Sequence, residues 1–261
     1  HLLTKGLVAS RQRAQQLIRA GKVRTVDGEI LDKPGKEVSK DLEVIIKESA
    51  RFVSRGGEKL VAALNEFPIK VDNRICLDAG ISTGGFTDCL LQFGASRVYG
   101  VDVGYGQTAW SIRNDHRVVL LERTNIRYLT TEKLFKTGDP LPNLAVADLS
   151  FISLRLVLPV ITSLIQKNNS DFLLLVKPQF EVGRERVGKG GIVRDIRAHV
   201  DALNSVIESA KELGLFLTGI IPSPITGAAG NQEYLIWLNF EKKEYSPLTE
   251  SFVETNLGLK S

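Results

Sequence analysis

The sequence predicts an α/β fold, namely a mostly parallel, doubly wound sheet of seven strands preceded by a small α+β domain. Between residues 75 and 215, short apolar runs alternate with helical stretches, which is typical of a parallel sheet. The last two apolar runs are joined by a loop without a helix, so the final strand is expected to be antiparallel. A basic helix and short strands come before this alternation and predict the separate small domain.

The composition agrees with one large and one small domain, because the chain has 261 residues, 43% hydrophobic and 25% charged. No apolar run approaches the roughly 18 residues that a membrane span needs, and we expect no signal peptide. Cys76 and Cys89 are expected to be buried thiols, with no metal site, as suits a reducing cytoplasm. The chain begins at His1 and has no Met, so we expect the natural N-terminus to lie upstream and methionines to be missing from the sequence.

Residues 1–46 are predicted to form the small domain. Ser10 is a good N-cap for a helix that ends near Gly21, and a turn at Asp27-Gly28 is a hairpin signal between short strands. The first 24 residues contain no acidic residue and six basic ones, which are Lys5, Arg11, Arg13, Arg19, Lys22 and Arg24. This basic region predicts an anionic partner, and a solvated basic helix face is the alternative.

Residues 47–58 are predicted to be a linker between the two domains. The large domain is expected over residues 59–245, beginning with an amphipathic helix at 59–67, and a C-terminal tail over 246–261.

The large domain contains seven predicted strands and five further helices. The strands are Ile75–Ala79, Arg97–Asp102, Val118–Leu121, Leu144–Asp148, Asp171–Lys177, Phe216–Ile221 and Tyr234–Phe240. The helices are expected at 85–93, near 107–113, near 130–136, at 153–166 and at 196–213. The first five strands connect through helices, and they are therefore expected to be parallel.

The turn after the first of these strands is the first candidate site. Asp78 ends the strand, and Gly80, Gly84 and Gly85 follow without Cβ atoms, so a ligand can lie against the backbone. The next strand ends at Asp102, where a carboxylate can accept both hydroxyl protons of a nucleotide ribose. The turn lacks the Gly-Lys-Ser/Thr of a P-loop and is not a G-x-G-x-x-G sequence.

This acid-first turn resembles the S-adenosylmethionine site of Rossmann-like methyltransferases. Seven strands with the last reversed is the usual plan of that fold. The resemblance implies S-adenosylmethionine as the cofactor, whose cationic sulfonium and amino-acid end tolerate nearby acids.

Four ionisable residues are predicted to stand at the edge of the sheet where ligands bind in open α/β folds: Lys59, Asp148, Lys177 and Glu233. A buried acid and lysine at the ends of adjacent strands are costly unless paired, and a purely structural ion pair is the alternative. Their order resembles the Lys-Asp-Lys-Glu tetrad of FtsJ-type ribose 2′-O-methyltransferases. The resemblance implies that Lys177 activates the hydroxyl, that Asp148 and Glu233 orient Lys177, and that Lys59 holds the ribose or completes the charge network.

Longer stretches resemble the TlyA family, whose members are often labelled hemolysin A. The stretches are 53–60, 77–88, 148–154 and 176–181, with two loops at 188–195 and 227–233. The basic helix and the hairpin likewise resemble the RNA-binding domain of ribosomal protein S-four. Together they imply a methyltransferase that modifies cytidine ribose in ribosomal RNA and that binds a ribosomal subunit. Carried over by position, the cofactor residues would be Asp78, Gly80, Ser82, Gly84, Asp102, Asn125 and Asp148.

Other functions remain open. One is a ribosome-assembly factor that binds RNA without turnover. Another is a membrane-active hemolysin, for which no amphipathic segment able to insert stands out. A base methyltransferase would ordinarily carry an Asn/Asp-Pro-Pro-aromatic motif or a catalytic cysteine, and residues 148–151 carry neither.

The segment from Pro178 to Asp195 is long, glycine-rich and basic. A loop of this length in a compact domain is usually functional or disordered. It could close over RNA, and Phe180 could stack under a flipped base.

Overall fold

The computed structural model describes residues 1–47, 50–244 and 246–259. The chain divides into two compact units, His1–Arg51 and Phe52–Ser261, each built around its own buried apolar side chains. Positions 48, 49, 245, 260 and 261, on which the predicted linker, the domain boundary and the tail partly fall, lie outside the described residues.

The first unit contains helix α1 (Arg11–Arg19) and an antiparallel pair, β1 (Val23–Thr25) and β2 (Val44–Ile46). The Oγ atom of Ser10 accepts the N–H of Arg13 at 3.1 Å and caps α1 as predicted. The structure differs from the hairpin expected at the Asp27-Gly28 turn, because β1 pairs with β2, which is distant in the sequence. The chain just after the Asp27-Gly28 turn makes only an isolated bridge, between Ile30 and Arg24.

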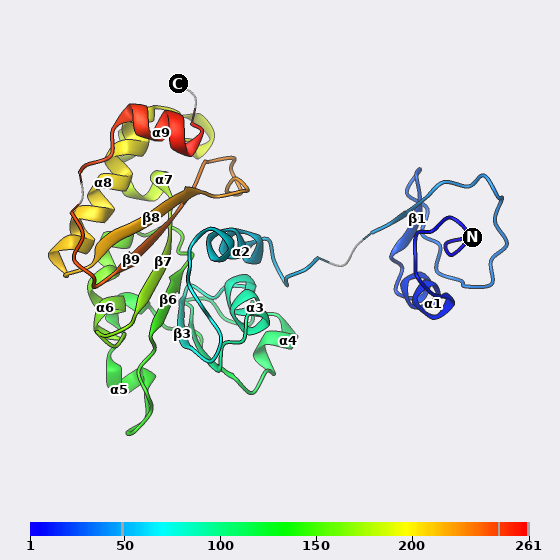
Figure 1. Cartoon of the computed structure of the whole chain (residues 1–261), viewed down its shortest axis with the longest axis horizontal. Helices are drawn as coiled ribbons and strands as arrows, with labels where there is room; N and C mark the ends of the chain where they lie inside the picture. The colour runs from blue at the N-terminus through cyan, green and yellow to red at the C-terminus, as the bar shows by residue number, and fades with distance from the viewer. Residues whose placement is uncertain (48–49, 245, 260–261) are drawn as a thin grey trace. The chain divides into compact units, whose positions relative to one another are not determined.

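The second unit is built on a seven-stranded sheet (Figure 1). Its strands are β3 (Ile75–Ala79), β4 (Arg97–Val101), β5 (Val118–Leu121), β6 (Leu144–Ala147), β7 (Asp171–Val176), β8 (Phe216–Pro222) and β9 (Tyr234–Asn239). Their spatial order is β5-β4-β3-β6-β7-β9-β8. Strands β3 to β7 are parallel, and β9 runs antiparallel to both of its neighbours. The predicted sheet with a reversed last strand is therefore confirmed.

Helices cover both faces of this sheet (Figure 1). The α2 side carries α2 (Gly56–Glu66), α3 (Gly85–Gln92) and α4 (Trp110–Arg113). The α8 side carries α5 (Thr131–Leu134), α6 (Leu158–Ser163), α8 (Ile196–Glu212) and α9 (Glu250–Leu257). Shorter helical turns are η1 (Ile126–Tyr128), η2 (Leu154–Leu156), α7 (Pro178–Glu181), η3 (Arg184–Arg186) and η4 (Lys189–Gly191).

Three predicted boundaries differ from the structure. The helix expected at 153–166 is divided into η2 and α6, because Pro159 lacks an N–H group and fits only the first turn of a helix. Residues 52–58 of the expected linker belong to the second unit, where Phe52 is buried and α2 begins at Gly56. In the expected tail, α9 buries Val253 and Leu257 against the α8 side.

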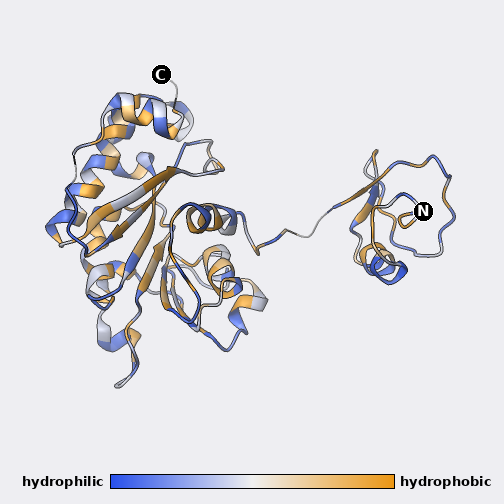
Figure 2. Cartoon of the chain, viewed as in Figure 1, coloured by the Kyte–Doolittle hydropathy of each residue, from blue (hydrophilic) through white to orange (hydrophobic). Residues whose placement is uncertain are grey.

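The strands bury side chains on both faces, and Figure 2 shows them as mainly hydrophobic. Successive side chains of a strand point to opposite faces. In β7, Phe172, Leu174 and Val176 join the core on the α8 side, while Leu173 and Leu175 join the core on the α2 side. The same alternation determines toward which face of the sheet the side chains next to a strand end are directed.

Candidate active site

Strand alternation turns Asp148, Lys177 and Glu233 to the same face of the sheet. Asp148 and Lys177 follow β6 and β7, and Glu233 comes just before β9. Each is next to a strand residue that packs on the α8 side, so its own side chain is directed toward the α2 side. Lys59 meets them there because it lies on the inner face of α2 and is only 8% exposed.

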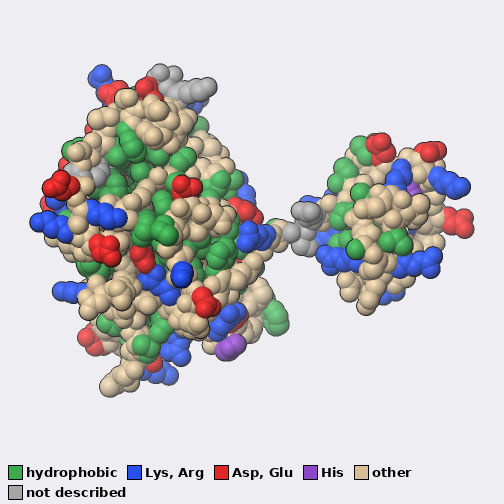
Figure 3. Space-filling model, viewed as in Figure 1, with side chains coloured by type: hydrophobic (Ala, Val, Ile, Leu, Met, Phe, Trp, Pro, Cys, Tyr) green, Lys and Arg blue, Asp and Glu red, His purple; other side chains and the backbone are tan. Residues whose placement is uncertain are grey.

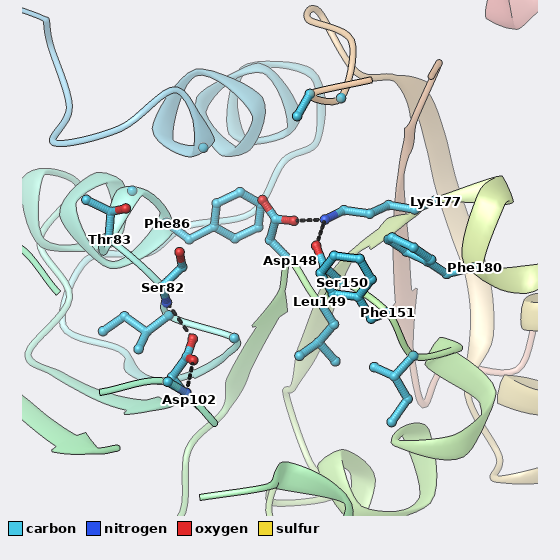
Figure 4. Close-up of a pocket in the computed structure, with 18 of the residues that line it drawn as sticks. Ser82, Thr83, Phe86, Asp102, Asp148, Leu149, Ser150, Phe151, Lys177 and Phe180 are labelled. Atoms are coloured by element: carbon cyan, nitrogen blue, oxygen red, sulfur yellow. Dashed lines mark hydrogen bonds and ion pairs between the residues drawn. The ribbon is translucent and has the colours of Figure 1, made fainter. Parts of the chain in front are cut away.

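The four side chains form a chain of alternating charge. Glu233 Oε2 lies 2.6 Å from Lys59 Nζ, and Asp148 Oδ2 lies 3.7 Å from the same atom. On the other side, Lys177 Nζ lies 2.6 Å from Asp148 Oδ1 and donates to Ser150 Oγ at 2.9 Å (Figure 4). Lys177 and Glu233 are 7% and 2% exposed. Charges buried to this degree cost several kcal/mol unless paired, and here every one has a partner of opposite sign.

The glycine-rich turn lies directly beside these residues. Gly80 has φ +88°, and a Cβ atom there would lie 2.9 Å from the carbonyl oxygen of Asp148. Gly84 has φ +100° and is the N-cap of α3, where a Cβ atom would crowd Ile112. Both positions therefore need glycine, and the bare backbone of the turn forms a cradle against the end of β6.

Asp102 fixes the other side of this cradle. Its Oδ2 atom accepts the N–H of Ser82 at 2.8 Å, and its Oδ1 atom accepts the N–H of Gly104 at 2.7 Å (Figure 4). Each carboxylate oxygen offers about two acceptor positions, so both keep a lone pair for hydroxyl donors such as those of a ribose. Asn125 also lines the cavity, and its Oδ1 atom caps η1 by accepting the N–H of Arg127 at 3.0 Å.

Asp78 lies behind the turn and is absent from the described residues that line the cavity. Its Oδ2 atom accepts the hydroxyl of Thr87 on α3 at 2.6 Å. Its Oδ1 atom has no hydrogen-bond partner in the part of the chain that the structure describes. Burial raises the pKa of Asp78 from 3.8 to about 7. This geometry assigns it to the attachment of α3 to β3.

Residues 80–83 of the turn line one cavity of about 1140 Å³ together with Asp102, Asn125 and the four ionisable residues. Figure 3 shows acidic and basic side chains lying close together near the middle of the face that it displays. The cavity exceeds the roughly 300–1,000 Å³ of a typical small-molecule pocket, so it can hold a nucleoside-sized cofactor and still admit part of a second molecule.

Phe151 is a feature of the site that sequence reasoning does not single out. It is 91% exposed and has φ +65°, a left-handed conformation that is strained for a bulky residue. Its ring lies beside that of Phe180, with 5.3 Å between the centroids (Figure 4). An apolar residue just after a buried strand usually predicts core, so the sequence gives no signal of this exposure.

Glu181 holds together the two chain segments that carry these rings, and the sequence does not predict this role. Its Oε2 atom accepts the hydroxyl of Ser153 at 2.5 Å, and its Oε1 atom accepts the N–H of Leu154 at 2.7 Å. These bonds fasten the loop after β6 to α7, and burial raises the pKa of the carboxyl. Such a pairing joins distant parts of the chain, so no local sequence pattern announces it.

The six predicted RNA-binding residues all belong to the first unit. Lys5, Arg11, Arg13 and Arg19 are exposed, while Lys22 and Arg24 are partly buried. Figure 3 shows basic side chains gathered over α1 in this unit. Across the described residues, no helix is long and apolar enough to cross a membrane.

Comparison with known proteins gives two family matches. The FtsJ-like methyltransferase model matches residues 52–240, and the S4 domain model matches residues 2–44. A Mycobacterium tuberculosis protein named 16S/23S rRNA (cytidine-2′-O)-methyltransferase TlyA is 50% identical over 239 residues, which are 91% of this chain and 87% of that protein. A Brachyspira hyodysenteriae protein named Hemolysin A is 43% identical over 234 residues, which are 89% of this chain and 95% of that protein.

Solved structures agree with these matches. One from Streptococcus thermophilus is 41% identical, with a TM-score of 0.73 over 95% of this chain and 90% of that chain. Fibrillarin from Aeropyrum pernix, solved with bound S-adenosyl-L-methionine, has a TM-score of 0.51 at 15% identity and covers 78% of this chain and 85% of that chain. At that identity the likeness shows a shared fold alone.

Proposed function

The chain belongs to the FtsJ-like methyltransferase family, and from that premise we propose that it methylates a ribose 2′-hydroxyl of ribosomal RNA with S-adenosylmethionine. The observation that carries this proposal is the chain of ion pairs formed by buried Glu233, Lys59 and Lys177 with half-buried Asp148, which lines the same cavity as the glycine-rich turn. The name of the Mycobacterium tuberculosis relative supports ribosomal RNA as the substrate class and cytidine as the nucleotide.

The residues of the turn fit the proposed cofactor. Gly80 lines the cavity without a side chain, Gly84 lets the turn pack against Ile112 at the start of α3, and Asp102 keeps acceptor capacity for ribose hydroxyls. We assign cofactor binding to the turn from Gly80 to Gly84 together with Asp102 and Asn125. S-adenosylmethionine would supply there an electrophilic methyl group on a cationic sulfur.

Lys177 is the residue that we assign to activation of the hydroxyl. A ribose hydroxyl is a poor nucleophile at neutral pH, and an ammonium group within hydrogen-bond distance stabilises the negative charge that develops on its oxygen. Asp148 and Ser150 hold Lys177 Nζ at 2.6 and 2.9 Å and therefore fix its direction. Lys59, held by Glu233, is placed to contact the same ribose. Two lysines and two carboxylates keep the site near neutrality.

The exposed ring of Phe151 and the partly buried ring of Phe180 provide a surface for the base of the target nucleotide. Base–aromatic stacking contributes roughly 1–3 kcal/mol per base and needs one open ring face. Phe180 also lies near the proposed activating group, with Lys177 Nζ 6.0 Å from its ring centroid. A nucleotide stacked here would have its ribose directed into the cavity. We assign RNA capture to the basic residues of the first unit, in agreement with its S4 domain match.

The test is methyl transfer from labelled cofactor to isolated ribosomal subunits from a strain that lacks the gene. Wild type is expected to label one or two ribose positions, identified because a 2′-O-methyl group makes the neighbouring linkage resistant to alkali. Lys177→Ala should lower kcat by about 100-fold to 1,000-fold, the usual effect of removing one stabilising donor. Subunit binding should stay unchanged, because Lys177 is mostly buried.

The matched control is Lys167→Ala, which removes an exposed lysine from the loop before β7 and should leave the rate unchanged. If wild type binds subunits but labels no RNA, the catalytic proposal is wrong and an assembly factor without turnover takes its place. If the label is sensitive to alkali, the methyl group is on a base.

A further inference from the structure

The basic segment 188–194 lies beside the site and is held by the buried side-chain amide of Asn231. Asn231 is 1% exposed. Its Nδ2 atom donates to the carbonyl of Gly191 at 2.7 Å, and its Oδ1 atom accepts the N–H of Val193 at 2.9 Å. The side chain therefore satisfies one acceptor and one donor of the same backbone stretch. An amide side chain can donate and accept at once, and a buried group of this kind is costly to remove.

A buried histidine holds the same stretch from its other side. His199 on α8 places Nε2 3.0 Å from the carbonyl of Val193 and Nδ1 2.8 Å from the hydroxyl of Tyr234. A carbonyl only accepts, so Nε2 must carry the proton and Nδ1 must accept the hydroxyl of Tyr234. Both ring nitrogens are then satisfied in the neutral ring. Burial lowers the pKa of His199, in agreement with this state.

These hydrogen bonds connect the segment to residues that neighbour the proposed catalytic residues Glu233 and Lys177. Tyr234 directly follows Glu233, and in the sheet it pairs with Val176, which directly precedes Lys177. Asn231 lies two residues before Glu233 and, like it, lines the cavity. The segment is thus attached to the two strand ends that present Glu233 and Lys177, and its position relative to them is set by hydrogen bonds.

The outer side of the segment is suited to an anionic strand. Residues 186–194 contain basic side chains and no acidic one, and Lys189 and Arg194 are exposed. Gly191 lines the cavity, and both it and Gly190 have left-handed backbone, with φ +76° and +78°. The conformation is therefore specific and is available to few other residues. Backbone without side chains beside lysine and arginine favours close contact with phosphates.

We propose that Asn231 and His199 are positioning residues, which hold segment 188–194 as a wall that binds the phosphates flanking the target ribose. Lys189 and Arg194 make this contact effectively only while the segment is fastened. This inference rests on the proposed function, because it takes RNA as the substrate. It adds a phosphate contact in the unit that carries the cavity, where the base and ribose contacts were assigned, to the basic residues assigned to RNA capture in the first unit.

The test is a double-mutant cycle between the buried fastening and the exposed cation, measured with isolated ribosomal subunits as the substrate. Asn231→Ala alone and Lys189→Ala alone should each raise KM for subunits by about tenfold while kcat changes less than threefold. The double variant should be only slightly worse than either single variant, because a released segment no longer presents Lys189. Filter binding of subunits, which needs no turnover, should show the same pattern.

Conservative variants separate positioning from general damage. His199→Gln keeps an amide donor for the carbonyl of Val193 and should retain most of the wild-type KM, whereas His199→Leu should lose it. Tyr234→Phe keeps the packing and removes only a hydroxyl, so it gives a smaller rise in KM even if Asn231→Ala fails to fold. Binding of S-adenosylmethionine should be unchanged in all of these variants.

Strictly additive effects of Asn231→Ala and Lys189→Ala would overturn the inference. The inference would also be overturned if Lys189→Ala and Tyr234→Phe both had the same KM for subunits as wild type. If the proposed function itself is wrong, the outcome is different, because wild type then binds subunits with normal affinity but transfers no methyl group to them.

Discussion

The carboxyl of Asp78 joins β3 to α3 behind the glycine-rich turn. It is fully buried, it accepts one hydrogen bond from Thr87, and its second oxygen has no partner among the described residues. Loss of solvation therefore dominates, and the pKa of Asp78 rises to about 7, with smaller contributions in the same direction from the charges of Asp148 and Asp102. A protonated carboxyl here costs less to bury than a charged one.

Stability should consequently depend on pH through Asp78. The folded protein holds this proton more tightly than the unfolded chain, whose aspartate has its ordinary pKa of 3.8. The stabilising contribution is therefore fully present below that ordinary pKa and is lost as the pH rises through about 7. Relative to Asp78→Asn, the free energy of unfolding of wild type should fall between about pH 4 and about pH 8, as measured by urea denaturation.

Asp78→Asn is a suitable reference because an amide keeps the size of the group and one acceptor for Thr87 while it cannot ionise. The difference between the two curves isolates the carboxyl from all other titrating groups. Parallel curves for the two proteins over this pH range would show that Asp78 is already ionised in the folded state, contrary to the prediction.

At the scale of elements, α2 and α3 approach each other through glycines. A Cβ atom on Gly85 would lie 2.9 Å from the backbone nitrogen of Gly57, and a Cβ atom on Gly57 would overlap the ring of Phe52. Phe52 is 2% exposed and cannot move aside. Glycine is unfavourable within a helix, so Gly85 reflects the close approach of the two helices and Gly57 reflects the space taken by the Phe52 ring. That approach places Lys59, two residues after Gly57, over the sheet.

Gly57→Ala should therefore destabilise the protein although alanine favours a helix. The gain in helix propensity is about 1 kcal/mol, whereas overpacking a core costs about 1–3 kcal/mol. The expected net loss in the free energy of unfolding, measured by urea denaturation, should come with slower methyl transfer because Lys59 shifts. In a Phe52→Ala background the same substitution should become neutral or stabilising. Equal effects in both backgrounds would refute the steric explanation.

The sequence predicts much of the site because of how strands end. Asp148 and Lys177 each follow an apolar strand directly, and parallel strands bring their carboxyl ends to one edge. The partners that hold these groups could not be predicted in this way. Ser150 bonds Lys177 across 27 positions and Thr87 bonds Asp78 across a helix–strand contact, and both depend on three-dimensional register. The predicted start of α2 is also too late, because a glycine pair usually indicates a flexible turn.

At the scale of the whole molecule, the chain separates a basic unit from a unit that holds the cavity. Electrostatic binding to phosphates weakens with salt by an amount that depends on how many phosphates are neutralised. The exposed arginines of α1 should therefore contribute to subunit affinity and its salt dependence, and we expect cofactor binding to depend on the second unit alone.

Arg11→Ala with Arg13→Ala should weaken subunit binding and reduce the slope of log K against log salt by about 2, close to one for each phosphate that is no longer neutralised. Affinity for S-adenosylmethionine should not change. The matched control is Lys33→Ala with Lys40→Ala, which removes the same charge from exposed positions elsewhere in this unit. An equal reduction from both pairs would indicate that only net charge matters, and that α1 makes no specific contact.

Strand β9 lies between β7 and β8, although it is the last strand of the sheet to be synthesised. Until it inserts, β7 keeps an open edge, and the start of β9 has not yet brought Glu233 to Lys59. The four charged side chains can therefore come together only after β9 has inserted between β7 and β8. A nascent chain can complete its glycine-rich turn early, but it gains its full set of charged side chains only after β9 has been made.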